Sequence, residues 1–130
     1  MKPTLLLALA LFATLPAQAG DTTPAQQLQH WNAQAGSPGD AARGQAFFTK
    51  RHGGEWSCAS CHQAPPTRAG QHASTGKAIA PLAPAVQPDR LTDSAKVEKW
   101  FRRNCKDVLS RECSAQEKAD VLAYLNALKP

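Results

Sequence analysis

The stretch Cys58-Ala59-Ser60-Cys61-His62 decides how this chain folds. Its two cysteines are three residues apart, so both thiols lie on one face of a helical turn, and a histidine follows directly. Thiols at this spacing can form thioethers with the two vinyl groups of one porphyrin, with the histidine beneath the ring and a nitrogen facing the iron. The stretch therefore predicts one haem c, attached covalently through Cys58 and Cys61, with His62 as an axial iron ligand.

The other two of the four cysteines are Cys105 and Cys113. In an oxidising compartment a disulfide is the default state for such a pair. Zinc competes for a set of four cysteines, but these spacings match no common zinc ribbon or finger. A thioredoxin-like thiol pair would need strands that alternate with helices, and the sequence offers no good strand. Both alternatives are weaker than a haem with a disulfide.

The N-terminus has the organisation of an export signal. Met1-Lys2 gives a short basic start, an apolar stretch covers residues 5–15, and Ala17-Gln18-Ala19 fits a cleavage site. The apolar stretch is too short to span a bilayer, and no second one follows. We therefore expect a cleaved signal peptide over residues 1–19, a single domain over residues 20–130, a periplasmic location and no membrane anchor.

Composition limits what this domain can build and bind. Alanine supplies much of the apolar fraction, so a core made of protein alone would be thin, and a large flat haem would complete it. The formal net charge is +5, to which Lys2 contributes one unit. The basic residues are scattered and not interleaved with aromatic residues, which argues against nucleic acid. A mildly basic surface fits either plain solvation or docking onto an acidic redox partner.

Capping residues and apolar periodicity predict four helices and no sheet. Thr22-Thr23-Pro24 opens the first, Asp40 caps the second, Thr92-Asp93 begins the third, and Ser114-Ala115-Gln116-Glu117 forms a capping box before the last. We expect the helices to cover approximately residues 24–35, 41–50, 93–109 and 115–128. The predicted fold class is all-α: a small class I-like cytochrome c domain with about four helices wrapped around one haem.

Two further patterns concern packing. Gly44 and Phe48 lie four residues apart, so a position without a side chain adjoins a large aromatic ring on one helix face. This arrangement permits close helix contact, and the helix is expected to cross the last helix near Tyr124. Residues 63–89 are rich in proline, glycine and serine and are expected to wrap a ligand, although 67–77 also fits a plain surface loop. A carbonyl near Pro81 is expected to accept a hydrogen bond from Nδ1–H of His62. Arg68 and Lys77 are candidate partners for the haem propionates.

The second axial ligand is the open question. Small cytochromes c mostly use a methionine sulfur, but the one methionine here is Met1, in the predicted signal peptide. The sixth position is therefore empty or filled by another group. His72, in the wrapping segment, is the strongest of the histidines, since His30 fits a surface position and His52 is too close in sequence to His62. A lysine remains an alternative.

Asn104 is the candidate singled out by its place on the third helix. The apolar stripe of Val97, Trp100 and Phe101 continues to Asn104 one turn later, so its amide faces the side that this stripe buries. A buried amide needs a hydrogen-bond partner or a metal, and its carbonyl oxygen can coordinate iron. An asparagine near a helix end that bonds to backbone explains the same position equally well.

Taken together, these residues resemble the SHP-type cytochromes c (sphaeroides haem protein). The resemblance covers nearly all of residues 20–130 and implies that His62 and Asn104 are the two axial ligands of the oxidised haem, with a Cys105–Cys113 disulfide beside Asn104. It also implies that the asparagine leaves the iron on reduction and that oxygen, nitric oxide or carbon monoxide then binds. The blocks that carry it are Gly20-Asp21-Thr22-Thr23-Pro24-Ala25-Gln26, the haem motif, Thr67-Arg68-Ala69-Gly70-Gln71, Thr75-Gly76-Lys77, Ile79-Ala80-Pro81-Leu82-Ala83-Pro84, Pro88-Asp89-Arg90, Val97-Glu98-Lys99-Trp100 and Arg103-Asn104-Cys105.

The expected function is a redox-gated, ligand-binding cytochrome that exchanges electrons with a partner protein. By the resemblance, that partner is a di-haem cytochrome c or a membrane cytochrome b, and the protein itself is a monomer. A hard, neutral amide oxygen suits ferric better than ferrous iron, which supports release on reduction. Two alternatives are a plain electron shuttle and an enzyme that turns over oxygen, nitric oxide or peroxide. No clear acid–base pair marks the chain as an enzyme.

Overall fold

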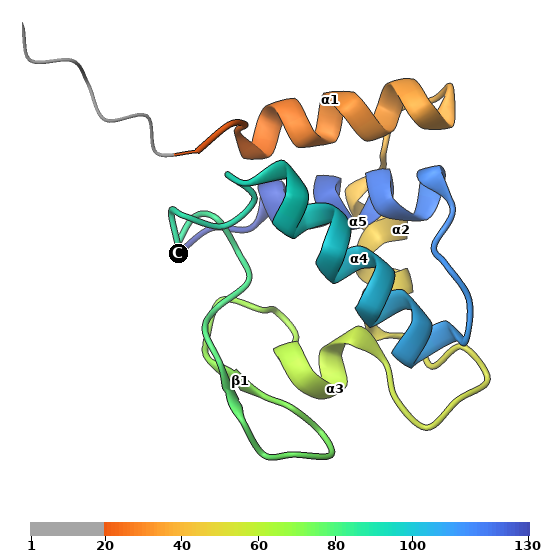
Figure 1. Ribbon diagram of the computed structural model, residues 1–130, viewed down its shortest axis with the longest axis vertical. Coiled ribbons are helices and arrows are strands. Elements are labelled where there is room, and N and C mark those ends of the chain that lie inside the picture. Colours follow the sequence, from red (N-terminus) through yellow and green to blue (C-terminus); the bar gives the residue numbers. More distant parts are fainter. Residues whose placement is uncertain (1–19) are drawn as a thin grey trace, which may run out of the picture.

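Five helices and one minimal sheet make up the fold in a computed structural model that describes residues 20–130. The predicted signal peptide, residues 1–19, lies outside the described residues. Between α3 (Cys58–His62) and α4 (Ser94–Leu109) two short strands pair antiparallel, with Gly70 opposite Ile79 (Figure 1). Within residues 20–130, no helix has the length and apolar character needed to cross a membrane. In chain order the elements are α1 (Pro24–Ala35), α2 (Ala41–Thr49), α3 (Cys58–His62), β1 (Gly70–Gln71), β2 (Ala78–Ile79), α4 (Ser94–Leu109) and α5 (Ala115–Ala127).

The four predicted helices begin at the predicted caps. Thr23, Asp40, Asp93 and Ser114 each accept a hydrogen bond from a backbone N–H of the first helical turn, which would otherwise lack a partner. At its other end, α1 stops at Gly36, whose φ of 69° is a left-handed conformation that glycine adopts without strain. Local capping chemistry thus sets the start of each long helix.

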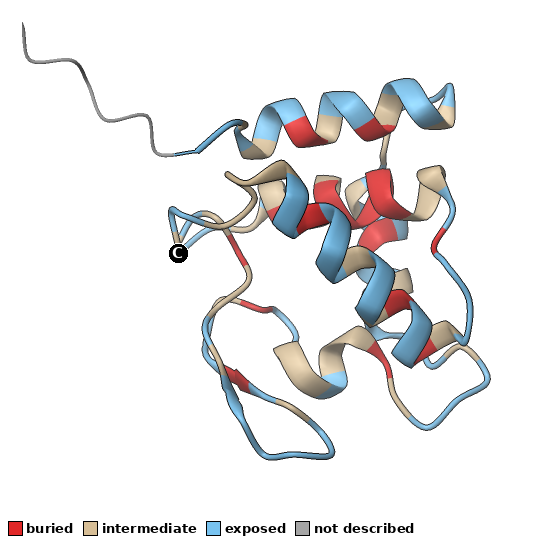
Figure 2. Cartoon of the chain, in the orientation of Figure 1, coloured by how far each residue is buried: buried red, intermediate tan, exposed pale blue. Residues whose placement is uncertain are grey.

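The crossing of α2 and α5 forms the main core, as predicted. The backbone of Gly44 lies so close to α5 that a Cβ there would clash with the carbonyl oxygen of Asp120 and lie 2.9 Å from Cβ of Tyr124. This approach brings the rings of Phe48 and Tyr124 to a centroid distance of 5.6 Å. Phe48 is only 1% exposed and packs with Val121 and Leu125, so these residues form a hydrophobic core. Figure 2 shows α5 as largely buried.

A buried carboxylate ties the segment before α2 to α5. Asp120 accepts hydrogen bonds from the backbone N–H of Asp40 (2.8 Å), from Nε of Arg43 (2.9 Å) and from the Gln116 amide (3.0 Å). Burial raises the pKa of this carboxyl, but the hydrogen bonds from Arg43, Asp40 and Gln116 outweigh it and hold the pKa below its usual value. The ionised form is therefore the one that clamps α2 onto α5.

Helix α4 is fixed at both ends. At its start the N–H of Ser94 donates to the carboxylate of Asp21 at 2.8 Å, and the Gln27 amide donates to the Ser94 hydroxyl at 3.1 Å. Near its end, Cys105 forms a disulfide with Cys113, just before α5. The middle of the helix faces the cavity described below. Helix α4 is therefore anchored at its two ends and does not pack along its whole length.

The short β1–β2 ladder corrects the expectation of a fold without a sheet. Its position follows from one close contact, because a Cβ on Gly70 would clash with the carbonyl oxygen of Cys61. Only glycine lets this segment lie directly on the backbone of α3. The middle of the wrapping segment is therefore a hairpin that packs against the haem-binding stretch. The four predicted helices are all present, and α3 is a fifth, short one.

Candidate haem site

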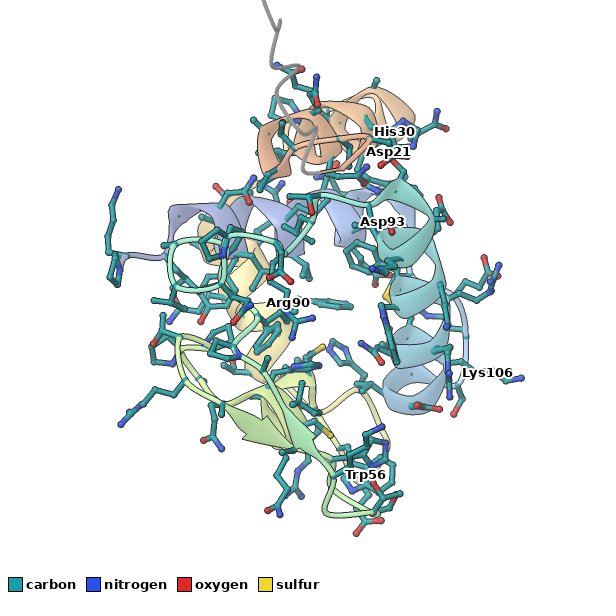
Figure 3. The ribbon with its side chains drawn as sticks, turned by 60° about the vertical axis from the view of Figure 1, so that its left-hand side comes forward. Asp21, His30, Trp56, Arg90, Asp93 and Lys106 are labelled. Carbon is teal, nitrogen blue, oxygen red and sulfur yellow. A yellow bond between two sulfur atoms is a disulfide. The ribbon has the colours of Figure 1, made fainter. Side chains whose placement is uncertain are left out.

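A cavity of about 540 Å³ lies between α3, the β1–β2 hairpin and α4. Figure 3 shows α4 on one side of this opening and the hairpin with α3 on the other. Most of the wall is apolar, as expected for a cofactor pocket of this size. Its larger apolar side chains are Phe47, Phe48, Trp56, Ile79, Leu82, Leu91, Val97, Trp100, Phe101, Val108, Val121 and Leu125.

The single turn of α3 is built by two serines. The hydroxyl of Ser60 accepts a hydrogen bond from the N–H of Ser57 at 2.9 Å, and the N–H of Ser60 donates to the carbonyl of Ser57 at 3.1 Å. This local pair starts the helix at Cys58 and so places Cys58, Cys61 and His62 along the cavity. This pair was not predicted, although a serine three residues before another at a helix start is a recognisable signal.

Cys58 lacks the lowered thiol pKa of a redox CxxC pair, and both motif cysteines are unbridged and so available for thioether bonds. Both line the cavity and form no disulfide. Burial raises the pKa of Cys58 to about 11, and the neighbouring Cys61 adds to the effect. A thiol-redox CxxC pair has a lowered pKa instead. The backbone N–H of Ala73, in the hairpin, donates to the sulfur of Cys61 at 3.3 Å and holds it in place.

His62 has the properties of a metal ligand. Its ring lies 6.2 Å from that of Phe48 and forms part of the cavity wall. Burial, with a contribution from the charge of Arg90, lowers the pKa of His62 to about 4. The imidazole is therefore neutral at physiological pH, which is the form that binds a metal.

The hydrogen bond predicted between His62 and a carbonyl near Pro81 is wrong. Nδ1 of His62 is buried without a partner among the described residues. The carbonyls of Pro81 and Ala80 instead accept hydrogen bonds from Nε and one terminal nitrogen of Arg90, each at 2.8 Å. A guanidinium offers five donors and competes for both acceptors at once, which a single imidazole N–H cannot match.

Arg90 is a functional candidate that was not predicted from the sequence. It lines the cavity, its two bonds to backbone fix its orientation, and within residues 20–130 it forms no ion pair with a carboxylate (Figure 3). A fixed guanidinium with donors to spare fits a carboxylate such as a haem propionate. Of the two residues suggested for that role, Lys77 lines the cavity, whereas Arg68 is exposed outside its wall.

On the opposite side, Asn104 projects from α4 into the cavity wall beside Trp100 and Phe101. The alternative that its side chain bonds to backbone does not hold, because the side-chain amide of Asn104 forms no hydrogen bond with any residue of 20–130. Trp100 lies in the same wall and is 47% exposed, because its side of the stripe borders the cavity instead of another helix.

The histidines considered as rivals lie in three different settings. His72 lines the cavity from the hairpin on the motif side, where the next residue, Ala73, donates its N–H to the sulfur of Cys61. Its Nδ1 accepts N–H bonds from Ser74 and Thr75 at 3.3 Å. His52 contacts the carbonyl of Phe47 through Nε2 at 2.8 Å. His30 is exposed on α1, away from the cavity (Figure 3).

These residues fit a covalently attached haem. The cavity combines two unbridged thiols on one helical turn, a neutral imidazole with one orphaned nitrogen, a fixed arginine without a carboxylate and large apolar walls. Two of the four cysteines are used in the disulfide, so the set does not form a four-cysteine zinc site.

Comparison with known proteins gives a consistent result. Residues 34–125 match a family described as a domain of unknown function, DUF1924. The chain is 56% identical over 116 residues to the cytochrome c-type protein SHP of Cereibacter sphaeroides, covering 86% of this chain and 89% of that protein.

Two solved structures resemble the fold closely. The structure of oxidised SHP, described as an oxygen-binding cytochrome c, matches with a TM-score of 0.77 and 55% identity over 84% of this chain and all of that one. The solution structure of cytochrome c'' from Methylophilus methylotrophus, described with reference to haem-ligand detachment, matches with a TM-score of 0.70 and 35% identity. It covers 82% of this chain and 94% of that one. The predicted class I-like cytochrome c fold is confirmed.

Proposed function

Because the chain belongs to the family of SHP-type cytochromes c and carries covalently bound haem c, we propose that it is a redox-gated, ligand-binding cytochrome of the periplasm. In this proposal His62 and Asn104 bind the iron of the oxidised protein, and Asn104 withdraws on reduction. When bound, the haem supplies a one-electron redox centre and a coordination position for oxygen, nitric oxide or carbon monoxide.

On the motif side, the chain's own residues attach and orient the group. Cys58 and Cys61 form the thioethers from one face of α3, and Gly70 with Ala73 holds Cys61 against the hairpin. His62 stays neutral because burial and the charge of Arg90 disfavour its protonated form. Arg90, pinned by two backbone carbonyls, binds a propionate.

Asn104 acts as the gate. The observation that carries the proposal is its position: an amide in the α4 wall of the cavity, without a hydrogen bond to another described residue. A neutral amide oxygen is a hard donor that holds ferric iron better than ferrous iron, so reduction weakens its hold. The disulfide at Cys105 follows directly in sequence and limits how far Asn104 moves, so the ligand returns on oxidation.

The relatives support a role in binding a diatomic gas. One solved relative is described as an oxygen-binding cytochrome c, and another is described in terms of haem-ligand detachment. From the sequence we further propose residues 20–130 as the mature, monomeric domain, with a redox protein as its electron partner, such as a di-haem cytochrome c or a membrane cytochrome b. Nothing in the cavity favours turnover of the ligand over its binding.

Ligand substitution in the oxidised protein tests the assignment of Asn104. Ferric wild-type protein should show the resonance Raman and absorption spectra of a six-coordinate haem with a weak-field oxygen ligand, and Asn104→Ala should shift both toward those of a five-coordinate or water-ligated haem. Added imidazole should bind the variant about tenfold or more faster, because no internal ligand competes. His72→Ala is the matched control and should keep the wild-type spectrum. A change in His72→Ala with none in Asn104→Ala would overturn the assignment.

A further inference from the structure

The solvent-facing side of α4 carries a stripe of cations, here called the α4 stripe: Lys96, Lys99, Arg102, Arg103 and Lys106, all exposed. At about 100° per residue these five positions fall within a sector of about 120°. Glu98 and Asp107 occupy the two borders of that sector. In Figure 2 the outer side of α4 is exposed along the helix, and in Figure 3 Lys106 points away from the molecule.

Most of this charge is not neutralised within the molecule. Only Lys96 has an ionic partner, Asp93, at 3.5 Å on the exposed surface. Lys99, Arg102, Arg103 and Lys106 form no ion pair with any residue of 20–130. Four free cations along one helix raise the local potential well above that of scattered surface charges.

Trp100 connects this stripe to the cavity. Its ring lies 5.5 Å from the ammonium of Lys99 and 5.3 Å from the guanidinium of Arg103. The same ring lines the cavity and is 47% exposed. The α4 stripe therefore borders the haem site directly, and one helix separates a protein docked there from the haem.

We propose that the α4 stripe is the docking surface for an acidic redox protein. This inference rests on the electron-transfer part of the proposed function and names the surface and chemistry of the partner. One electron leaves the reduced centre of the partner, which is oxidised, and reduces the ferric haem behind α4. The partner's carboxylates face the stripe, and Trp100 lies at the edge of the contact.

A protein partner fits α4 better than a membrane. Helices that bind lipid surfaces insert an apolar face beneath a cationic one. The apolar face of α4, with Val97 and Val108 buried, instead faces the interior and the haem cavity, so it has little to insert. Charge without insertion is the pattern of steered protein association.

The test is the rate of reduction of the holoprotein by reduced flavodoxin, a small acidic redox protein, in a stopped-flow instrument at several salt concentrations. Lys99→Glu/Arg103→Glu should lower the second-order rate constant about tenfold or more at low salt and flatten its salt dependence. Lys50→Glu/Lys129→Glu makes the same change in net charge on exposed residues elsewhere and should lower it no more than about threefold.

Equal losses in the two charge-matched pairs, or a wild-type rate that salt does not change, would overturn the proposal. So would binding to phosphatidylglycerol vesicles that the Lys99→Glu/Arg103→Glu pair abolishes while the flavodoxin rate stays the same. If that pair fails to fold, Arg102→Glu/Lys106→Glu replaces it. Carbon monoxide binding to the ferrous variants should equal wild type, so a failure of the gating proposal is recognised separately.

Discussion

Replacing Gly44 by alanine should destabilise the protein strongly, because no room exists for a single methyl group. A Cβ at this position would clash with the carbonyl oxygen of Asp120, lie 2.5 Å from its carbonyl carbon and 2.9 Å from Cβ of Tyr124. These atoms are backbone or the first side-chain carbon, so no rotamer change relieves the clash and α2 must move away from α5. Overpacking in a core costs about 1–3 kcal/mol. Because the contact is with rigid backbone, Gly44→Ala should lower the free energy of unfolding by about 3 kcal/mol, the upper end of this range.

Guanidinium chloride unfolding of the holoprotein, followed by circular dichroism, measures this cost. Gly54→Ala is the matched control, since it makes the same change where the nearest atom to the new Cβ, the Val108 carbonyl oxygen, is 3.5 Å away. That control should change the free energy of unfolding by less than about 1 kcal/mol, in the stabilising direction. A Gly44→Ala variant as stable as Gly54→Ala would refute the tight α2–α5 crossing.

Three further outcomes follow from the contacts around the core and cavity. Asp120→Asn should lower the free energy of unfolding by about 2 kcal/mol at pH 7. Because the folded-state pKa of Asp120 is lowered, its contribution is complete above about pH 4 and lost as pH falls through that pKa, so denaturant unfolding at pH 2 should separate variant and wild type far less. Arg90→Gln should lower the reduction potential in a spectroelectrochemical titration and lower the free energy of unfolding by about 1–2 kcal/mol. Arg90→Lys should restore the potential. An unchanged potential in Arg90→Gln would contradict the place of Arg90 at the haem. Cys105→Ser/Cys113→Ser should lower the free energy of unfolding by about 2–3 kcal/mol and slow the return of the oxidised spectrum after reoxidation, and unchanged spectra and kinetics would rule out a restraint on Asn104.

The features that the sequence predicted correctly are local ones. Helix starts at Thr23, Asp40, Asp93 and Ser114 depend on side chains that bond within the next turn, so nearby residues suffice to find them. The motif that predicted a covalent haem is equally local, while the roles of its individual residues stay a prediction. Gly44 was found because one missing side chain next to an aromatic residue has few other uses in a helix.

The features that it missed depend on contacts between distant segments. Arg90 donates hydrogen bonds to the carbonyls of Ala80 and Pro81. The periodicity of a sequence does not show which of several donors bonds to a carbonyl in a proline-rich segment. An apolar stripe also does not distinguish a helix face that packs on another helix from one that lines a cavity, as the Trp100 side of α4 does. The ladder at Gly70 is too short to leave a pattern of alternation.

The central claim is that reduction frees the iron from Asn104, and the kinetics of carbon monoxide binding to the dithionite-reduced holoprotein test it most directly. If Asn104 has left, the observed rate should rise in proportion to carbon monoxide concentration and match that of Asn104→Ala. Ferrous wild-type protein whose rate levels off at high carbon monoxide while Asn104→Ala keeps rising, or which does not bind carbon monoxide at all, would contradict the account.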